Sequence, residues 1–158
     1  MTDNTDITVQ VEADDSGVCI YSDQIVAFFL GGQRYALPIE RVQEIQQIVA
    51  FSAVPESRQS VVGMVNLRGE VIPAVDVRRL VGLPPQEYCL ETPMIICRHN
   101  GQLVALLVDE VQDVLGLPVG CVQEAPALNA LSSKMIGVAR LDDGLAYLLD
   151  LDKLLGGL

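Results

Sequence analysis

The sequence predicts a mainly β protein made of two small β-barrels that lie side by side. Short runs of apolar and β-branched residues alternate with tight turns along most of the chain, which is typical of antiparallel strands. The pattern of the first half also repeats in the second half. Each copy is about 55–60 residues long, and a unit of that size buries only about 60% of its surface by itself. We therefore expect the two copies to pack on each other and share a core.

Four hairpins follow from the order of apolar runs and turns. Each joins two short runs across a segment that contains glycine, a typical turn residue. The expected pairs are Ile25–Leu30 with Arg34–Leu37, Val61–Leu67 with Val71–Asp76, Met94–Arg98 with Leu103–Asp109, and Ile136–Leu141 with Leu145–Asp150. A connecting strand gives each copy an odd number of strands, which favours closure into a barrel because closure removes exposed strand edges.

Two short helical turns are expected, one at the end of each copy. Asp76 precedes a helical segment that stops at Gly82, and Asp150 precedes one that stops at Gly156. Aspartate is a preferred N-cap residue, and glycine commonly ends a helix. Each turn should therefore begin directly after its aspartate.

An internal repeat relates the two halves without gaps inside the matched segments. The matches are Gly32–Leu37 with Gly101–Leu106 at an offset of 69 residues, and Gly63 with Gly137 and Asp76 with Asp150 at an offset of 74. Gly63 and Gly137 stand at the same place in equivalent strands. A glycine inside a strand often marks a close approach of another chain segment, so we expect a packing reason for Gly63.

The acidic residues are unevenly distributed. The net charge is −11, and residues 1–24 carry six of the 21 acidic residues and no basic residue. We expect residues 1–24 to form a flexible acidic leader, with a short extra strand at Val18–Tyr21 as the alternative, and residues 25–158 to form the folded domain. A surface with this charge repels phosphate backbones, which excludes nucleic acid as a partner.

Composition also argues against membrane insertion, a metal site or a bound cofactor. The longest apolar runs have six residues, far short of the roughly 20 that a membrane-spanning helix needs. No secretory signal or transit peptide is visible. The four cysteines show no CxxC or zinc-type spacing, and the chain has a single histidine. Reduced, partly buried thiols are the expectation, as in a cytoplasmic protein.

Catalytic motifs are missing from the sequence. It contains no GxSxG, GxGxxG or GxxxxGK[ST] pattern. His99 falls at an expected hairpin tip, where we expect it to be solvated. The acids Asp109, Glu110 and Asp113 follow a strand and are expected to be solvated as well. The sequence therefore predicts a binding protein rather than an enzyme.

The turn of the second hairpin is the least ordinary part of the chain. Asn66 interrupts an apolar strand, and Arg68 stands in the turn itself. The other copy has Arg140 and Asp142 at these places. The two copies thus share a scaffold but differ at this tip, which points to a local role. We expect Glu44 to hold the Arg68 guanidinium in a forked ion pair.

These residues resemble a known family. Asn66–Gly69, followed by Ile72-Pro73 and Asp76–Arg78, resembles the NLRG…P…D(L/V)R signature of CheW-type chemotaxis coupling proteins. Val42–Ile45 is similar to the VQEI element of that family, and Val108–Val114 is similar to its VDxVxDV element. The resemblance runs from about Ile25 to Leu155.

The resemblance implies a non-catalytic cytoplasmic adaptor in a two-component signalling system. Its fold would be two five-stranded SH3-like barrels on a shared core, roughly residues 25–90 and 91–158, with an exchange of strands at the ends left open. Its partners would be the cytoplasmic tips of methyl-accepting chemoreceptors and the regulatory domain of the histidine kinase CheA. It would be recruited to receptor arrays at the membrane without inserting into the bilayer.

The resemblance also implies site residues. The receptor-facing groove and its rim would contain Val42, Glu44, Gly63, Asn66 and Arg68. The kinase contacts would include Ile39 in the first barrel and Leu128, in the loop 125–128, in the second.

Three other interpretations stay open at this point. The first is an adaptor of the same fold in a parallel array, such as one that controls twitching or biofilm formation. The second is a regulatory piece of a larger kinase or coupling protein. The third, an enzyme or small-ligand barrel, would require a polar constellation inside a pocket.

Overall fold

The computed structural model describes residues 23–48, 51–53, 61–84, 86–89, 91–127 and 130–156. Of the expected leader, this leaves only Asp23 and Gln24. The alternative strand at Val18–Tyr21 lies outside the described residues.

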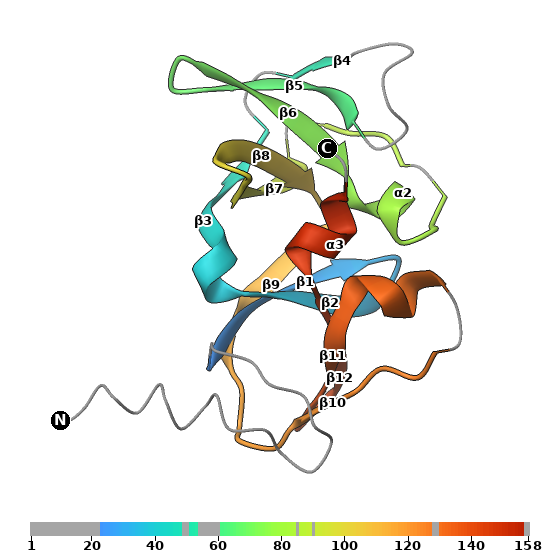
Figure 1. Ribbon diagram of the computed structural model, residues 1–158. Helices are drawn as coiled ribbons and strands as arrows, with labels where there is room; N and C mark the ends of the chain where they lie inside the picture. The colour runs from blue at the N-terminus through green and yellow to red at the C-terminus, as the bar shows by residue number, and fades with distance from the viewer. Residues whose placement is uncertain are drawn as a thin grey trace, which may run out of the picture. The chain divides into compact units, whose positions relative to one another are not determined.

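Strands account for most of the described elements (Figure 1). The strands are β1 (Gln24–Leu30), β2 (Gln33–Pro38), β3 (Val42–Gln47), β4 (Phe51–Ala53), β5 (Val61–Leu67), β6 (Glu70–Asp76), β7 (Pro93–His99), β8 (Gln102–Leu107), β9 (Glu110–Gly116), β10 (Val122–Gln123), β11 (Met135–Leu141) and β12 (Gly144–Leu149). The helices are the short α2 (Val77–Leu80) and α3 (Leu151–Leu155), and the 3-10 turns are η1 (Ile39–Arg41) and η2 (Ala130–Lys134).

The mainly β fold class is confirmed, and the four predicted hairpins are present as β1–β2, β5–β6, β7–β8 and β11–β12. The β7–β8 turn shows why asparagine and glycine occupy a hairpin turn. Asn100 and Gly101 have φ angles of 53° and 76°. A two-residue hairpin turn with positive φ at both positions matches the twist of its strands, and Asn-Gly is its preferred sequence.

The strands form two six-stranded sheets. One has the order β10-β11-β12-β2-β1-β9, and the other has the order β3-β7-β8-β6-β5-β4. The chain forms two compact units. Phe28–Gly32 and Arg41–Val111 form one, here the central unit. The described residues up to Ala27, Gln33–Glu40, and the chain from Gln112 onward form the other, here the terminal unit.

Each unit takes strands from both halves of the sequence. In the central unit, β6 pairs in parallel with β8, so that Ala74 lies opposite Ala105. In the terminal unit, β12 pairs in parallel with β2, so that Leu148 lies opposite Ala36. The offsets of 74 and 69 residues convert one pairing into the other. The two copies thus fold alike, but a hairpin from one half completes the sheet of the other.

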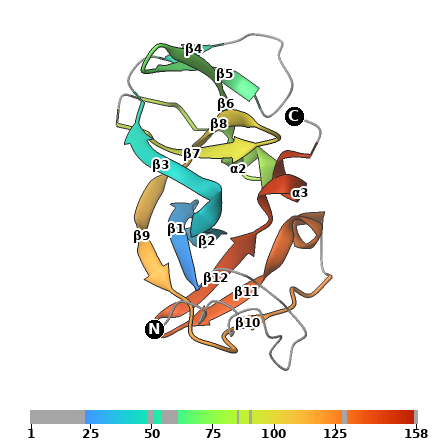
Figure 2. The same cartoon turned by 60° about the vertical axis from the view of Figure 1, so that its left-hand side comes forward.

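The same relation appears in single hydrogen bonds. The Ile48 amide donates to the Thr92 carbonyl over 3.0 Å, and the Leu117 amide donates to the Asp23 carbonyl over 2.8 Å. An offset of 69 residues relates both partners. Figure 2 shows β3 running beside β7 and β8 in the central unit, in line with the antiparallel β3–β7 pairing.

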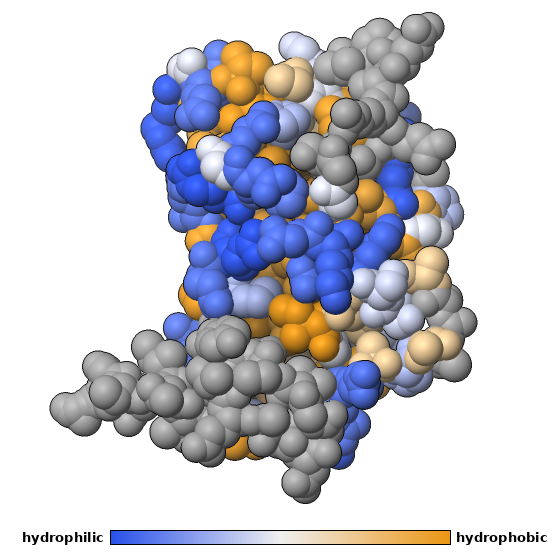
Figure 3. Space-filling view, viewed as in Figure 1, coloured by the Kyte–Doolittle hydropathy of each residue, from blue (hydrophilic) through white to orange (hydrophobic). Residues whose placement is uncertain are grey.

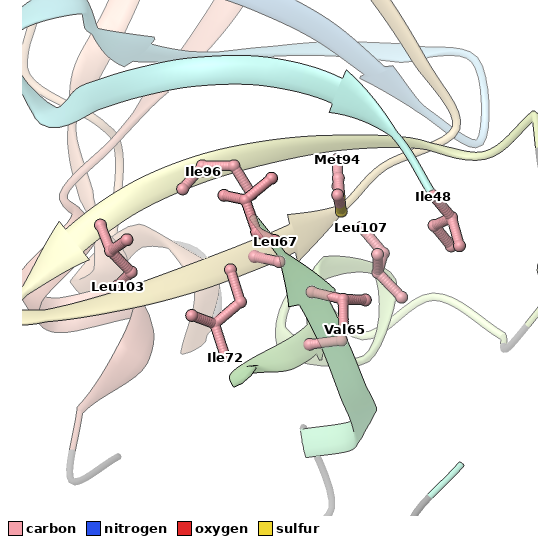
Figure 4. Packing of buried hydrophobic residues seen from close by; sticks show 10 residues of the cluster. Ile48, Val65, Leu67, Ile72, Met94, Ile96, Leu103 and Leu107 are labelled. Carbon is pink, nitrogen blue, oxygen red and sulfur yellow. The ribbon is translucent and has the colours of Figure 1, made fainter. Parts of the chain in front are cut away.

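Each unit has its own hydrophobic cluster. In the central unit, side chains from four paired strands point toward one another (Figure 4). This cluster contains Ile48, Val65, Leu67, Ile72, Ala74, Met94, Ile96, Leu103, Ala105 and Leu107. The cluster of the terminal unit contains Ile25, Ala36, Leu117, Cys121, Val122, Ala139, Ala146 and Leu148.

Both predicted helical turns are confirmed, with aspartate caps. The Asp76 carboxylate accepts from the Arg78 amide over 3.0 Å, and the Asp150 carboxylate accepts from the Lys153 amide over 3.2 Å. These bonds satisfy amides that have no partner inside a helix. Gly156 ends α3 with a φ of 56°, which side chains disfavour.

The expectation of a solvated His99 is wrong. Strand β7 continues through His99, so its side chain alternates with that of the exposed Arg98 and turns inward. Only 5% of His99 is exposed, and its Nε2 lies 3.3 Å from the Asn100 side-chain nitrogen.

Candidate functional site

The five residues expected at the receptor-facing site all lie in the central unit. Val42 and Glu44 belong to β3, and Gly63 and Asn66 belong to β5. Arg68 stands in the β5–β6 turn. In the sheet, β3 is one edge and β5 lies next to the other edge.

The β5–β6 turn holds Arg68 in an unfavourable backbone conformation. Its φ is 51°, and that of Gly69 is 85°. For a residue with a Cβ atom, the left-handed region costs about 1–2 kcal/mol, and asparagine is the usual choice at the first turn position. The side-chain oxygen of Asn66 accepts from the Gly69 amide over 3.0 Å and so supports the turn. The turn therefore fixes where the arginine side chain begins.

The predicted ion pair between Arg68 and Glu44 is present, but as a single contact rather than the expected fork. The guanidinium donates to one carboxylate oxygen of Glu44, and the Gln46 side-chain amide donates to the other over 3.1 Å. The hydrogen bond from Arg68 is the main reason why the pKa of Glu44 lies below its ordinary value. The Arg68 side chain remains 65% exposed. This contact joins the β5–β6 tip to the edge strand β3 at the other side of the sheet, which shows that the sheet curls toward a barrel-like form.

Gly63 has the packing reason that the sequence suggests. A Cβ atom built there would lie 2.5 Å from the Phe51 ring and 2.5 Å from the Ser52 carbonyl oxygen. Gly137 in the other copy has the same constraint, because a Cβ atom there would lie 2.5 Å from the Gln123 carbonyl oxygen. In both units a short strand packs directly on the glycine.

A comparison with protein-family models gives a match to the CheW-like domain over residues 24–157. The chain belongs to the CheW-like family.

Relatives and a solved structure agree with this membership. The chain is 27% identical to the chemotaxis protein CheW of Helicobacter pylori over 133 residues, which cover 84% of this chain and 81% of that protein. It is 31% identical to the chemotaxis protein CheW of Bacillus subtilis over 104 residues, which cover 66% and 67% of the two chains. The crystal structure of the scaffolding protein TtCheW from Thermoanaerobacter tengcongensis matches with a TM-score of 0.77 and 27% identity, over 85% of this chain and 93% of that one.

Sequence reasoning missed a second arginine that contacts strand β3. Arg98, in β7, donates to the Gln43 side-chain oxygen in β3 over 3.2 Å. The two residues lie far apart in the sequence. Because glutamine carries no charge, no opposite charges mark them as partners. Their proximity follows from the β3–β7 pairing alone.

A polar network in the central unit was also missed. Tyr88 donates its hydroxyl to the buried Asp76 carboxylate, and burial is the main reason why the tyrosine pKa is raised. Asp109 is not simply solvated: it accepts from the Gly31 amide over 2.8 Å and pairs with Arg78. Tyr88 thus ties the loop that precedes β7 to the end of β6, and Asp109 ties the end of β8 to α2 and to the β1–β2 turn.

The terminal unit has an ion pair of reversed polarity. Here the acid, Asp143, is in the hairpin turn, and the arginine, Arg34, is in β2. They meet at 2.8 Å, and Arg34 also donates to the Leu145 carbonyl over 3.3 Å. Arg34 is 7% exposed, and its hydrogen bond is the main reason why the pKa of Asp143 lies below its ordinary value.

The two residues expected at the kinase contacts stay predictions. Ile39 opens η1 and is partly buried in the terminal unit. Leu128 lies outside the described residues.

The described residues hold no group of three or more His, Cys, Asp or Glu side chains suited to a metal ion. Within the same ranges, no helix is long and apolar enough to span a bilayer. Cys89 and Cys97 are free thiols, and burial raises the pKa of Cys97 to about 12. A protonated thiol of this kind is a poor nucleophile.

Proposed function

We propose that the chain is a non-catalytic adaptor of bacterial chemotaxis that couples methyl-accepting chemoreceptors to the histidine kinase CheA. The family match over nearly the whole folded chain supports this function, as do the chemotaxis relatives and the scaffolding protein of the same fold. It works in the cytoplasm, at receptor arrays, and needs neither a cofactor nor membrane insertion.

The β5–β6 tip is the observation that carries the proposal. Arg68 occupies a backbone conformation that asparagine would adopt at lower cost, and the equivalent tip of the other copy has Asp142 in its place. The shared scaffold therefore does not require an arginine there. Its guanidinium is held by Glu44 yet largely exposed, which presents a fixed charged rim to a partner.

The receptor contact includes Val42, Glu44, Gly63, Asn66 and Arg68, and a helical receptor tip fits such a rim in the helix-in-groove mode. Ile39 and Leu128 contribute to the kinase contacts. Because array contacts must exchange during signalling, each should be modest in area, and joining two on one body raises avidity.

The test uses purified protein, receptor signalling-tip fragments and the CheA regulatory domain, with binding measured by calorimetry or pull-down. Arg68→Ala should weaken receptor binding about tenfold and leave the melting temperature nearly unchanged, because exposed ion pairs add little stability. Arg68→Lys should recover only part of the binding, since the compact ammonium group of lysine does not reproduce the planar guanidinium with its fixed set of donors. Arg68→Asn should bind as poorly as Arg68→Ala while keeping or improving stability.

Arg140→Ala is the matched control, because Arg140 is also an exposed hairpin arginine but lies in the terminal unit. It should bind receptor fragments as the unmodified chain does. Full binding by Arg68→Ala, or equal losses for both variants, would contradict the proposed site. Failure of the unmodified chain to bind receptor fragments and CheA would contradict the function itself.

A further inference from the structure

The outer face of the β5–β6 hairpin is more apolar than a solvent-facing sheet surface should be. Val65, Leu67, Ile72 and Ala74 point into the core of the central unit. The alternate residues face outward, and across the hairpin Met64 lies opposite Pro73 and Asn66 lies opposite Val71. Three of these four outward residues are apolar.

Antiparallel sheets with one face in water normally alternate apolar residues inside with polar residues outside. Val71 breaks this rule most clearly, because 61% of it is exposed. Where Figure 1 draws β5 and β6, Figure 3 shows hydrophobic residues at the surface beside hydrophilic ones.

This face is continuous with the rim described above. Asn66 belongs to both, and Val71 follows the turn that carries Arg68 and Gly69. The ion pair to Glu44 and the Asn66–Gly69 hydrogen bond hold the hairpin tip in place. A partner that touches the guanidinium therefore meets an ordered apolar surface directly beside it, without having to order the tip.

We propose that Met64, Val71 and Pro73 form an apolar docking strip for the receptor tip, with Val71 as a specificity-determining contact. This inference rests on the proposed function and extends its site to Met64 and Val71, which lie outside the family signature positions, and to Pro73, which lies within the signature. The fitting partner is one helix of the tip, with its apolar side on the strip and its polar flank toward Asn66 and Arg68.

The internal repeat supplies a control at the equivalent place. Val138, Arg140, Leu145 and Tyr147 stand in the terminal unit where Met64, Asn66, Val71 and Pro73 stand in the central unit. Leu145 is 48% exposed. Leu145 lines a cavity of about 430 Å³ together with Pro126 and Leu131. Residues from the segment between β10 and β11 therefore flank the outer face of the β11–β12 hairpin. Leu145 thus matches Val71 in strand position and exposure, but not in surroundings.

The test compares Val71→Glu, Val71→Thr and Leu145→Glu in the full chain, with receptor-tip binding, CheA regulatory-domain binding and the melting temperature as readouts. Val71→Glu should weaken receptor binding about tenfold or more, because a carboxylate would be buried against an apolar helix side. Val71→Thr keeps the β-branched shape that favours a strand and should lose binding a few-fold. Leu145→Glu should stay within about twofold of the unmodified chain.

The outcomes separate the two proposals. If Val71→Glu binds receptor fragments normally while Arg68→Ala does not, the strip is wrong and the proposed function stands. Equal losses of receptor binding for Val71→Glu and Leu145→Glu would also overturn the strip. So would a loss of binding by Val71→Glu that the unfolding of this variant fully explains. If the unmodified chain binds no receptor fragment, the proposed function fails and the inference fails with it.

Discussion

Replacing Gly63 by alanine should detach or shift strand β4. The added Cβ atom would lie 2.5 Å from the Ser52 carbonyl oxygen, roughly 0.8 Å closer than an ordinary carbon–oxygen contact allows. Phe51 could turn its ring away, but the carbonyl oxygen belongs to the backbone of β4 itself. The pairing of Phe51–Ala53 with β5 must therefore open or slide.

The magnitude follows from two contributions. Overpacking a tight site costs about 1–3 kcal/mol, and each backbone hydrogen bond lost from the β4–β5 ladder costs about 0.5–1.5 kcal/mol. We expect a total loss of about 2–4 kcal/mol in the free energy of unfolding. For a domain of this size, that lowers the melting temperature by about 5–15 °C.

Thermal unfolding followed by circular dichroism measures the effect. Gly116→Ala is the control: Gly116 also lies in a strand, but a Cβ atom there would have nothing within 4 Å. That variant should be neutral or slightly more stable, because alanine restricts the unfolded chain. Adding Phe51→Ala to Gly63→Ala should give less than the sum of the two losses, since the ring is one of the clashing groups.

Gly63→Ala melting at the temperature of Gly116→Ala would refute this reasoning. The same geometry bears on Gly63→Asp. The family resemblance places Gly63 in the receptor-facing groove, which by itself would predict lost receptor binding in an unchanged fold. The structure instead predicts that binding is lost through a displaced β4 and that stability falls as well.

Two further predictions concern the polar networks. Tyr88→Phe should lower the free energy of unfolding by about 1–2 kcal/mol, because buried Asp76 loses one donor and keeps the Arg78 amide; thermal melts check this, and an equal or higher melting temperature would contradict it. Arg34 holds the pKa of Asp143 below its usual 3.8. The contribution of this ion pair to the free energy of unfolding is therefore fully present above pH 3.8 and is lost as the pH falls through the lowered pKa. The free energy of unfolding in urea should therefore fall less between pH 5 and pH 2.5 for Asp143→Asn than for the unmodified chain. Identical pH profiles of the two proteins would disprove the role of this pair.

The local elements could be predicted because their signals lie within a few residues. Asp76 and Asp150 cap helices directly after them, and Asn100-Gly101 forms a hairpin turn that few other residue pairs favour. The ion pair of Arg68 with Glu44 was also predictable, because the repeat showed that the arginine was not needed by the scaffold and the acid lay in the adjoining motif.

Contacts made by sheet pairing between distant segments could not be predicted. Arg34 and Asp143 stand more than a hundred positions apart, and their ion pair exists because β12 pairs in parallel with β2. The buried state of His99 depends on where β7 ends, which alternation alone leaves uncertain by a residue or two. The sequence pattern predicts an ordinary strand position for Val71. Its exposure emerged only once the inward face of β6 was known.

The exchange of hairpins between the two halves determines the order in which the protein can fold. The central unit closes when Ala105 meets Ala74, some thirty positions earlier in the chain. The terminal unit closes when Tyr147 meets Tyr35, which was synthesised more than a hundred residues before. Loop closure over the longer span is slower and costs more entropy. The central unit should therefore form first on the ribosome, with β2 awaiting its partner, and no cut near the middle of the chain would yield two self-sufficient barrels.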